Sequence, residues 1–274
     1  VVFGGCGDLG SMFGDTWEAQ RGAWLRAADD GPPPRASHVA IFDPVSASTL
    51  VFGGIGAGDY VANQTWLWNG ERWRTVDAVE TAAPSPRYSP AVAYDAERKR
   101  IVMFSGSGRG DDEMWEWDGR RWHAIEPSGP MPSSRARAGM AFDPVRETVL
   151  MFGGFAGESL GDTWEWNGSR WRQLDVDGPP KRNNHCMATD PVRRRIVLFG
   201  GADRADDQNK GDTWEWNGER WRLASTSGPS PRVMAAMTYD ADRQSVVMLG
   251  GRLQDRSASD ELWQWNGEHW RLRE

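Results

Sequence analysis

The sequence predicts an all-β fold, a single six-bladed β-propeller over residues 1–274. Three observations predict it: a tryptophan-rich segment recurs six times, each copy has the pattern of four short strands, and tight-turn residues separate those strands. A four-stranded unit of this length cannot bury both faces alone, so it must pack on its neighbours. Radial packing in a closed ring leaves only short, protected edges.

The repeat is anchored by tryptophan. One tryptophan recurs every 49 or 50 residues, a second follows it by two residues in five copies, and a third follows it by seven residues in all six. The first members are Trp17, Trp66, Trp115, Trp164, Trp214 and Trp263. These three positions account for all 17 tryptophans, so none is left over as a special ligand platform. We expect the stacked indoles to fill the wedges between blades.

The four strands are clearest in the fourth copy, at residues 138–143, 148–154, 162–167 and 170–174. Asp-Pro and Asn-Gly pairs lie between them and are strong turn formers. In the first strand small and large residues alternate, which suits a crowded place where several strands converge. The expected blade units are residues 1–27, 35–76, 87–125, 135–174, 182–224 and 232–273.

These features resemble the kelch family. The double glycine after an apolar run, as in VFGG (51–54), MFGG (151–154) and LFGG (198–201), is similar to the kelch double glycine, and the tryptophans match other kelch positions. The resemblance covers essentially the whole chain and departs locally, at Ser105 and Ala19. It implies a six-bladed propeller whose axial mouth binds partner peptides or small ligands.

The first copy lacks its first strand. About 21 residues of a full ring are absent between the last tryptophan and the first double glycine, by comparison with the other copies. An unpaired inner edge would expose backbone donors and acceptors. We therefore expect the native protein to extend upstream of Val1 and supply that strand. The alternative is a gap filled by another chain or a ligand.

Length variation predicts where the site lies. The double glycine precedes the first tryptophan by 9 to 13 residues, and the last tryptophan precedes a recurring arginine by 11 to 14, whereas the other spacings are constant. Strands alternate in direction, so both variable segments share one face of the disc, where binding loops are expected. The predicted site is the axial mouth on this face. The candidate ligand-binding residues are His38, Tyr88, Arg137, Asn184, His185 and Met234.

The arginines have two interpretations. Arg35, Arg87, Arg135, Arg182 and Arg232 obey the repeat, which favours a scaffold role over a ring that binds anions. Some kelch modules grip acidic peptides with arginine near the start of the inner strand, and Arg137 alone matches that position. Its equivalents are Ser37, Ser89, Asn184 and Met234.

Composition and motifs exclude several classes of protein. With 32 Lys+Arg against 39 Asp+Glu the net charge is −7, which argues against nucleic-acid binding. No apolar run approaches 18 residues, so no membrane insertion is expected. Two cysteines exclude a disulfide scaffold. Asp111, Asp112 and the aspartates at 203, 206 and 207 have no calcium-loop pattern, so no metal and no cofactor is predicted. The 29 Arg against 3 Lys suggest a GC-rich gene, as in many bacteria.

The leading functional interpretation is a monomeric recognition scaffold that binds a protein or a small polar ligand at the axial mouth. The alternative is a propeller enzyme, of isomerase, cyclase or oxidase type, that acts on a carbohydrate or natural product there. Tyr88, Arg137 and His185 would then be its acid/base and anchoring groups. A third interpretation is a structural repeat of a larger extracellular protein. Fold alone does not decide between them.

Overall fold

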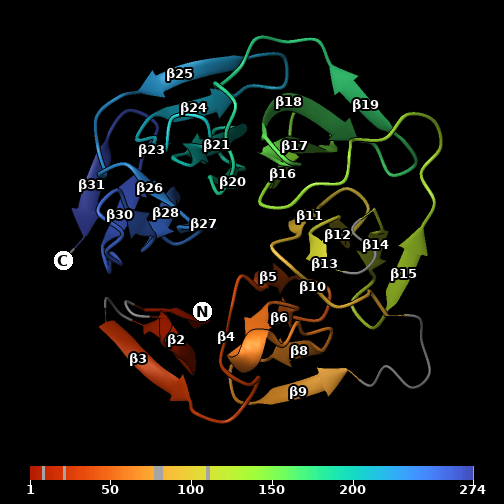
Figure 1. Cartoon of the computed structure of the whole chain (residues 1–274), viewed down its shortest axis with the longest axis vertical. Helices are drawn as coiled ribbons and strands as arrows, with labels where there is room; N and C mark the ends of the chain where they lie inside the picture. The colour runs from red at the N-terminus through yellow and green to blue at the C-terminus, as the bar shows by residue number, and fades with distance from the viewer. Residues whose placement is uncertain (8–9, 21–22, 77–82, 109–111, 274) are drawn as a thin grey trace. The chain divides into compact units, whose positions relative to one another are not determined.

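The computed structural model describes residues 1–274 except 8–9, 21–22, 77–82, 109–111 and 274. The chain forms two compact units, residues 1–94 with 98–126 and residues 95–97 with 127–274. The described residues form three antiparallel blades in each unit, red to yellow-green in the first and green to blue in the second (Figure 1). The all-β prediction with six blades is confirmed.

The first blade of the first unit has three strands and the other two blades have four, paired in chain order. The first blade consists of β1 (Val2–Cys6), β2 (Met12–Gln20) and β3 (Ala23–Ala28), so the described residues give it no inner strand, as predicted. The second consists of β5 (Val39–Asp43), β6 (Ser48–Phe52), β8 (Thr65–Trp68) and β9 (Trp73–Val76). The third consists of β11 (Ala91–Asp95), β12 (Arg100–Phe104), β14 (Met114–Trp117) and β15 (Trp122–Ile125).

The second unit has three four-stranded blades. They are β16 (Gly139–Asp143), β17 (Thr148–Phe155), β18 (Ser159–Trp166) and β19 (Trp171–Leu174); β20 (Cys186–Asp190), β21 (Arg195–Phe199), β24 (Thr213–Trp216) and β25 (Trp221–Ser225); and β27 (Ala236–Asp240), β28 (Ser245–Leu249), β30 (Leu262–Trp265) and β31 (Trp270–Arg273).

Short two-stranded ladders precede or flank the blades, and they were not predicted. They are β4 (Arg35–Ala36) with β7 (Ile55–Gly56), β10 (Arg87–Tyr88) with β13 (Ser107–Gly108), β22 (Ala202–Asp203) with β23 (Gln208–Asn209), and β26 (Arg232–Val233) with β29 (Arg252–Leu253). A short 3-10 turn, Ala57–Asp59, follows β7.

Tryptophan side chains join adjacent blades of each unit. The indole Nε1 of Trp122 on β15 donates to the hydroxyl of Thr65 on β8 at 2.9 Å, and Trp221 on β25 donates to Thr163 on β18 at 3.1 Å. Trp73 and Trp270 make the same bond to threonines of the preceding blade. A buried indole N–H needs such an acceptor. The expectation that indoles fill the space between blades is confirmed within each unit.

The recurring arginines are scaffold groups, as predicted. Arg135 is buried; its Nε donates to the Ser133 carbonyl at 2.9 Å and its Nη1 to the Gly153 carbonyl at 3.1 Å. Its guanidinium also binds both carboxylate oxygens of Asp162, at 2.6 and 3.0 Å. The same Asp162 accepts the indole N–H of Trp164 at 2.6 Å. We call this combination of buried arginine, carboxylate and tryptophan the arginine clasp.

Four blades carry a complete clasp. Its members are Arg87–Glu113–Trp115, Arg135–Asp162–Trp164, Arg182–Asp212–Trp214 and Arg232–Glu261–Trp263. The carboxylate always stands two residues before the first tryptophan of the repeat. The sequence therefore contains a signal for the whole clasp, of which the prediction used only the arginine.

The second blade has an incomplete clasp, because Gln64 stands where the other blades have a carboxylate. Arg35 is 2% exposed, and its Nη2 lies 3.4 Å from the amide oxygen of Gln64. The buried Nε1 of Trp66 has no hydrogen-bond partner among the described residues. Burial lowers the pKa of the Arg35 guanidinium, so its charge is poorly compensated.

We expect Gln64→Glu to raise the free energy of unfolding by about 1 to 2 kcal/mol, because the new carboxylate pairs with buried Arg35 and accepts the Trp66 N–H. Glu113 and Glu261 show that a glutamate reaches this place. Urea unfolding followed by tryptophan fluorescence measures the change. Asn63→Asp adds the same charge one residue away, on an exposed side chain, and serves as the control. Equal effects of the two substitutions would contradict the prediction.

Candidate functional site

Three inner-loop residues of the second unit lie side by side. Arg137, Asn184 and Met234 stand shortly before the inner strands β16, β20 and β27, with positive φ angles of 61°, 55° and 61°. The backbone N–H of Asn184 donates to the Arg137 carbonyl at 3.0 Å, and that of Met234 donates to the Asn184 carbonyl at 2.9 Å. A left-handed conformation is costly for arginine and methionine, so these backbone bonds between blades hold it in place. We call these residues the inner-loop arc.

The arc presents three different side chains. Met234 is 51% exposed. The guanidinium of Arg137 is half-buried and makes no hydrogen bond or ion pair to another described residue, and the amide of Asn184 donates to the Asn183 side chain at 2.7 Å. A cation, an amide and a thioether therefore stand at equivalent positions of three neighbouring blades. The structure brings these three of the predicted residues together.

The blade loops extend the arc outward. Asn183 is buried and donates to the Ser159 hydroxyl at 3.0 Å, and the same hydroxyl accepts the backbone N–H of Arg204 at 3.0 Å. The Arg204 guanidinium lies over the Phe155 ring, 5.3 Å from its centre. These four residues were not predicted, because they obey no repeat and their contacts connect two blades.

In the first unit the same backbone arrangement recurs at two serines. Ser89 N–H donates to the Ser37 carbonyl at 2.8 Å, and both residues have positive φ. Tyr88, a predicted site residue, is half-buried and pairs with Ser107 in the β10–β13 ladder. The ring of His38 packs edge-on against Phe3, with centroids 5.3 Å apart. Burial, and then the charge of Arg35, lower the pKa of His38 to about 4.

His185 directly follows Asn184 of the arc, but its side chain is not on the surface. Its side chain is buried and packs edge-on against Phe152, with centroids 5.6 Å apart, and neither ring nitrogen makes a well-formed hydrogen bond to a described residue. Burial, and then the Arg182 charge, lower the pKa of His185 to about 3. The ring and Met187 together explain the small residue at Gly139, where an added Cβ would lie 2.5 Å from Met187 Sδ and 2.6 Å from His185 Nε2.

The cysteines and aspartates form no metal-holding cluster among the described residues. Cys186 is buried, and burial raises its thiol pKa to about 12, so it is a poor nucleophile. No three histidine, cysteine, aspartate or glutamate side chains of the described residues gather to hold a metal. Asp206 pairs with Lys210 at 2.5 Å, and Asp111 lies outside the described residues. In the described part of the chain no helix has the length and apolarity to cross a membrane.

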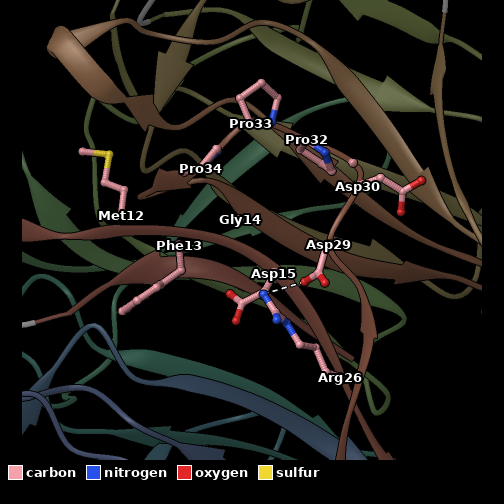
Figure 2. A pocket seen from close by; sticks show the side chains of 11 residues that line it. Met12, Phe13, Gly14, Asp15, Arg26, Asp29, Asp30, Pro32, Pro33 and Pro34 are labelled. Atoms are coloured by element: carbon pink, nitrogen blue, oxygen red, sulfur yellow. Dashed lines mark ion pairs between the residues drawn. The ribbon is translucent and has the colours of Figure 1, made fainter.

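Two clefts are lined by residues outside the arc. The larger, of about 460 Å³, lies in the first unit among β2, β3 and residues 29–34 (Figure 2). Asp15 lines it and accepts the Trp17 indole N–H at 2.8 Å, while Arg26 pairs with Asp29 at 2.5 Å. The smaller, of about 130 Å³, lies in the second unit beside Glu165 and Arg170. No predicted site residue lines either cleft.

Comparison with known proteins agrees with the repeat. The family model described as the KLHDC2/KLHL20/DRC7 Kelch-repeats domain matches residues 1–174. The search of the curated proteins gives no match. The matched residues span the first four blades. The chain therefore belongs to the Kelch-repeat family, and the six blades of its described residues are those of a β-propeller.

Proposed function

We propose that this chain is a non-catalytic recognition scaffold and that the inner-loop arc of the second unit contacts its protein partner. Kelch propellers are typically protein-interaction domains. The observation that carries the proposal is the arc itself, in which backbone bonds fix Arg137, Asn184 and Met234 side by side. An exposed methionine and a guanidinium without a partner among the described residues, on the two sides of Asn184, are typical of interaction surfaces.

A protein partner is favoured over a small substrate. Neither of the two clefts is lined by an arc residue, and Met234 stands open on the surface instead of lining a cavity. Small-molecule sites are usually concave and mostly enclosed. The enzyme alternative names Tyr88, Arg137 and His185. The His185 ring is buried, and its pKa of about 3 makes it a weak base that carries no proton to donate near pH 7. The recognition scaffold is therefore the function that the geometry supports best.

The test uses peptides selected from a displayed random library for binding to the whole chain. We expect the double substitution Arg137→Ala with Met234→Ala to weaken the selected peptides at least about tenfold, since both side chains would lie at the centre of the interface. Fluorescence anisotropy measures Kd, and the melting temperature should not change.

Arg220→Ala is the control, because this exposed arginine lies in the β24–β25 turn, at the opposite end of its blade. Peptides that bind both variants as tightly as the unchanged chain would exclude the arc. A peptide that loses binding only with Arg220→Ala would place the contact at the turn end.

A further inference from the structure

The arginine clasp defines the position of one negatively charged oxygen. In each complete clasp a single carboxylate oxygen accepts both the arginine Nη2 and the tryptophan Nε1. For Asp212 Oδ2 these distances are 2.9 Å to Arg182 and 2.7 Å to Trp214, and for Glu261 Oε2 they are 2.6 Å to Arg232 and 3.0 Å to Trp263. The two donors converge on one point because the backbone around them repeats from blade to blade.

The second blade keeps both donors and lacks the acid. Arg35 Nε donates to the Pro33 carbonyl at 2.9 Å and Nη1 to the Gly53 carbonyl at 3.1 Å, as in the complete clasps. Its Nη2 finds only the neutral oxygen of Gln64, at the long distance of 3.4 Å. The Trp66 Nε1 is buried, and its N–H donates a hydrogen bond to no described residue. By analogy with the complete clasps, the charged Nη2 and the unpaired indole N–H correspond to the two donors that share one carboxylate oxygen in the other blades.

The two donors lie behind exposed residues of one loop. Gln64 and Asn63 are exposed, and Tyr60 in the same loop is 56% exposed. No described carboxylate forms an ion pair with Arg35, whereas the other four repeat arginines each bind one. A buried guanidinium favours an anionic acceptor strongly because little water competes for it.

We propose that the second blade binds a carboxylate group, supplied by a small molecule or by an acidic side chain of a partner, between Arg35 Nη2 and Trp66 Nε1. The bound oxygen takes the place that Glu113, Asp162, Asp212 and Glu261 oxygens take in their own clasps. Gln64 lies at the surface side of this place and turns outward to admit the ligand. The proposal is independent of the inner-loop arc.

The test titrates the whole chain with sodium formate, the smallest carboxylate, and follows the tryptophan indole N–H signals by NMR. We expect the Trp66 signal to move saturably, toward the positions of Trp115, Trp164, Trp214 and Trp263, which already bind carboxylates. Those four signals are the internal control and should stay in place. Trp66→Phe identifies the signal.

Two substitutions of Gln64 sharpen the test. In the Gln64→Glu variant the new carboxylate of the chain itself occupies the position between Arg35 and Trp66. The Trp66 signal of this variant should therefore start at the shifted position and not respond to formate. Gln64→Ala removes the competing amide, so formate should bind several-fold more tightly than to the unchanged chain. The side chain at this position is exposed, so both variants retain the fold.

The titration covers formate concentrations of about 1 to 100 mM at constant ionic strength. A Trp66 signal that does not move, or that moves equally in the Gln64→Glu variant, overturns the proposal. Acetate and a blocked glutamate peptide then distinguish the two sources of the carboxylate. Binding of acetate alone indicates a small ligand, whereas binding of the peptide as well indicates an acidic side chain of a partner. Arg137→Ala with Met234→Ala should leave all these results unchanged.

Discussion

Arg182→Ala is expected to lower the free energy of unfolding by about 3 to 5 kcal/mol, the largest effect we predict for a single substitution. Arg182 has no exposed surface, and its Nε and Nη1 donate to the Pro180 and Gly200 carbonyls at 3.0 and 2.9 Å. Its guanidinium binds both oxygens of Asp212, at 2.7 and 2.9 Å. Burial disfavours the Asp212 charge, but Arg182 outweighs this and lowers its pKa. Alanine would leave that charge and two carbonyls without their partner.

Urea unfolding measures this loss, with Arg220→Ala as the exposed control that changes stability by less than about 0.5 kcal/mol. Arg182→Lys keeps the charge without the planar fork, so an intermediate loss is expected. Arg182→Ala combined with Asp212→Asn should cost less than the sum of the two single changes, because both act on one contact. If the loss of the double variant equals the sum of the two single losses, Arg182 and Asp212 do not act as one unit.

The sequence predicts the blades well because local rules determine them. Trp164 and Trp166 share a strand face, and turn formers such as Asn167-Gly168 lie between strands, so β18 and β19 follow from spacing alone. The scaffold role of Arg135 follows from its recurrence. Its bond to Asp162, 27 residues away, does not, because that contact depends on how the loop before β16 folds back on β18.

The candidate site is predicted less completely. Arg137, Asn184 and Met234 differ among the copies of the repeat, and this difference is the signal in the sequence that singles them out. His185 is predicted with them because it stands at the start of an innermost strand. Its burial depends on Phe152 of the preceding blade, which no pattern along the chain could show. Asn183 and Ser159 could not be predicted for the same reason, because their contact joins two blades.

Acid is expected to destabilise the chain through His185. The folded-state pKa of about 3 lies below the ordinary 6.5, so the unfolded state binds more protons between these values. The stabilisation from the neutral ring is fully present above pH 6.5 and is lost as the pH falls toward 3. Between pH 7 and pH 4.5 we expect His185 to account for a loss of about 2 to 3 kcal/mol in the free energy of unfolding.

His185→Ala should flatten this dependence, because alanine does not titrate. Ala138 and Ala235 occupy the same repeat position in other blades, so alanine fits the backbone, although space opened beside Phe152 lowers stability at every pH. The test therefore compares how steeply the free energy of unfolding changes with pH, and not its absolute value. His38, whose pKa is also lowered, keeps part of the slope in this variant. If His185→Ala and the unchanged chain lose equal stability from pH 7 to pH 4.5, the buried ring is not the acid-sensitive group. The clasp aspartates Asp162 and Asp212 have lowered pKa values and respond below that range.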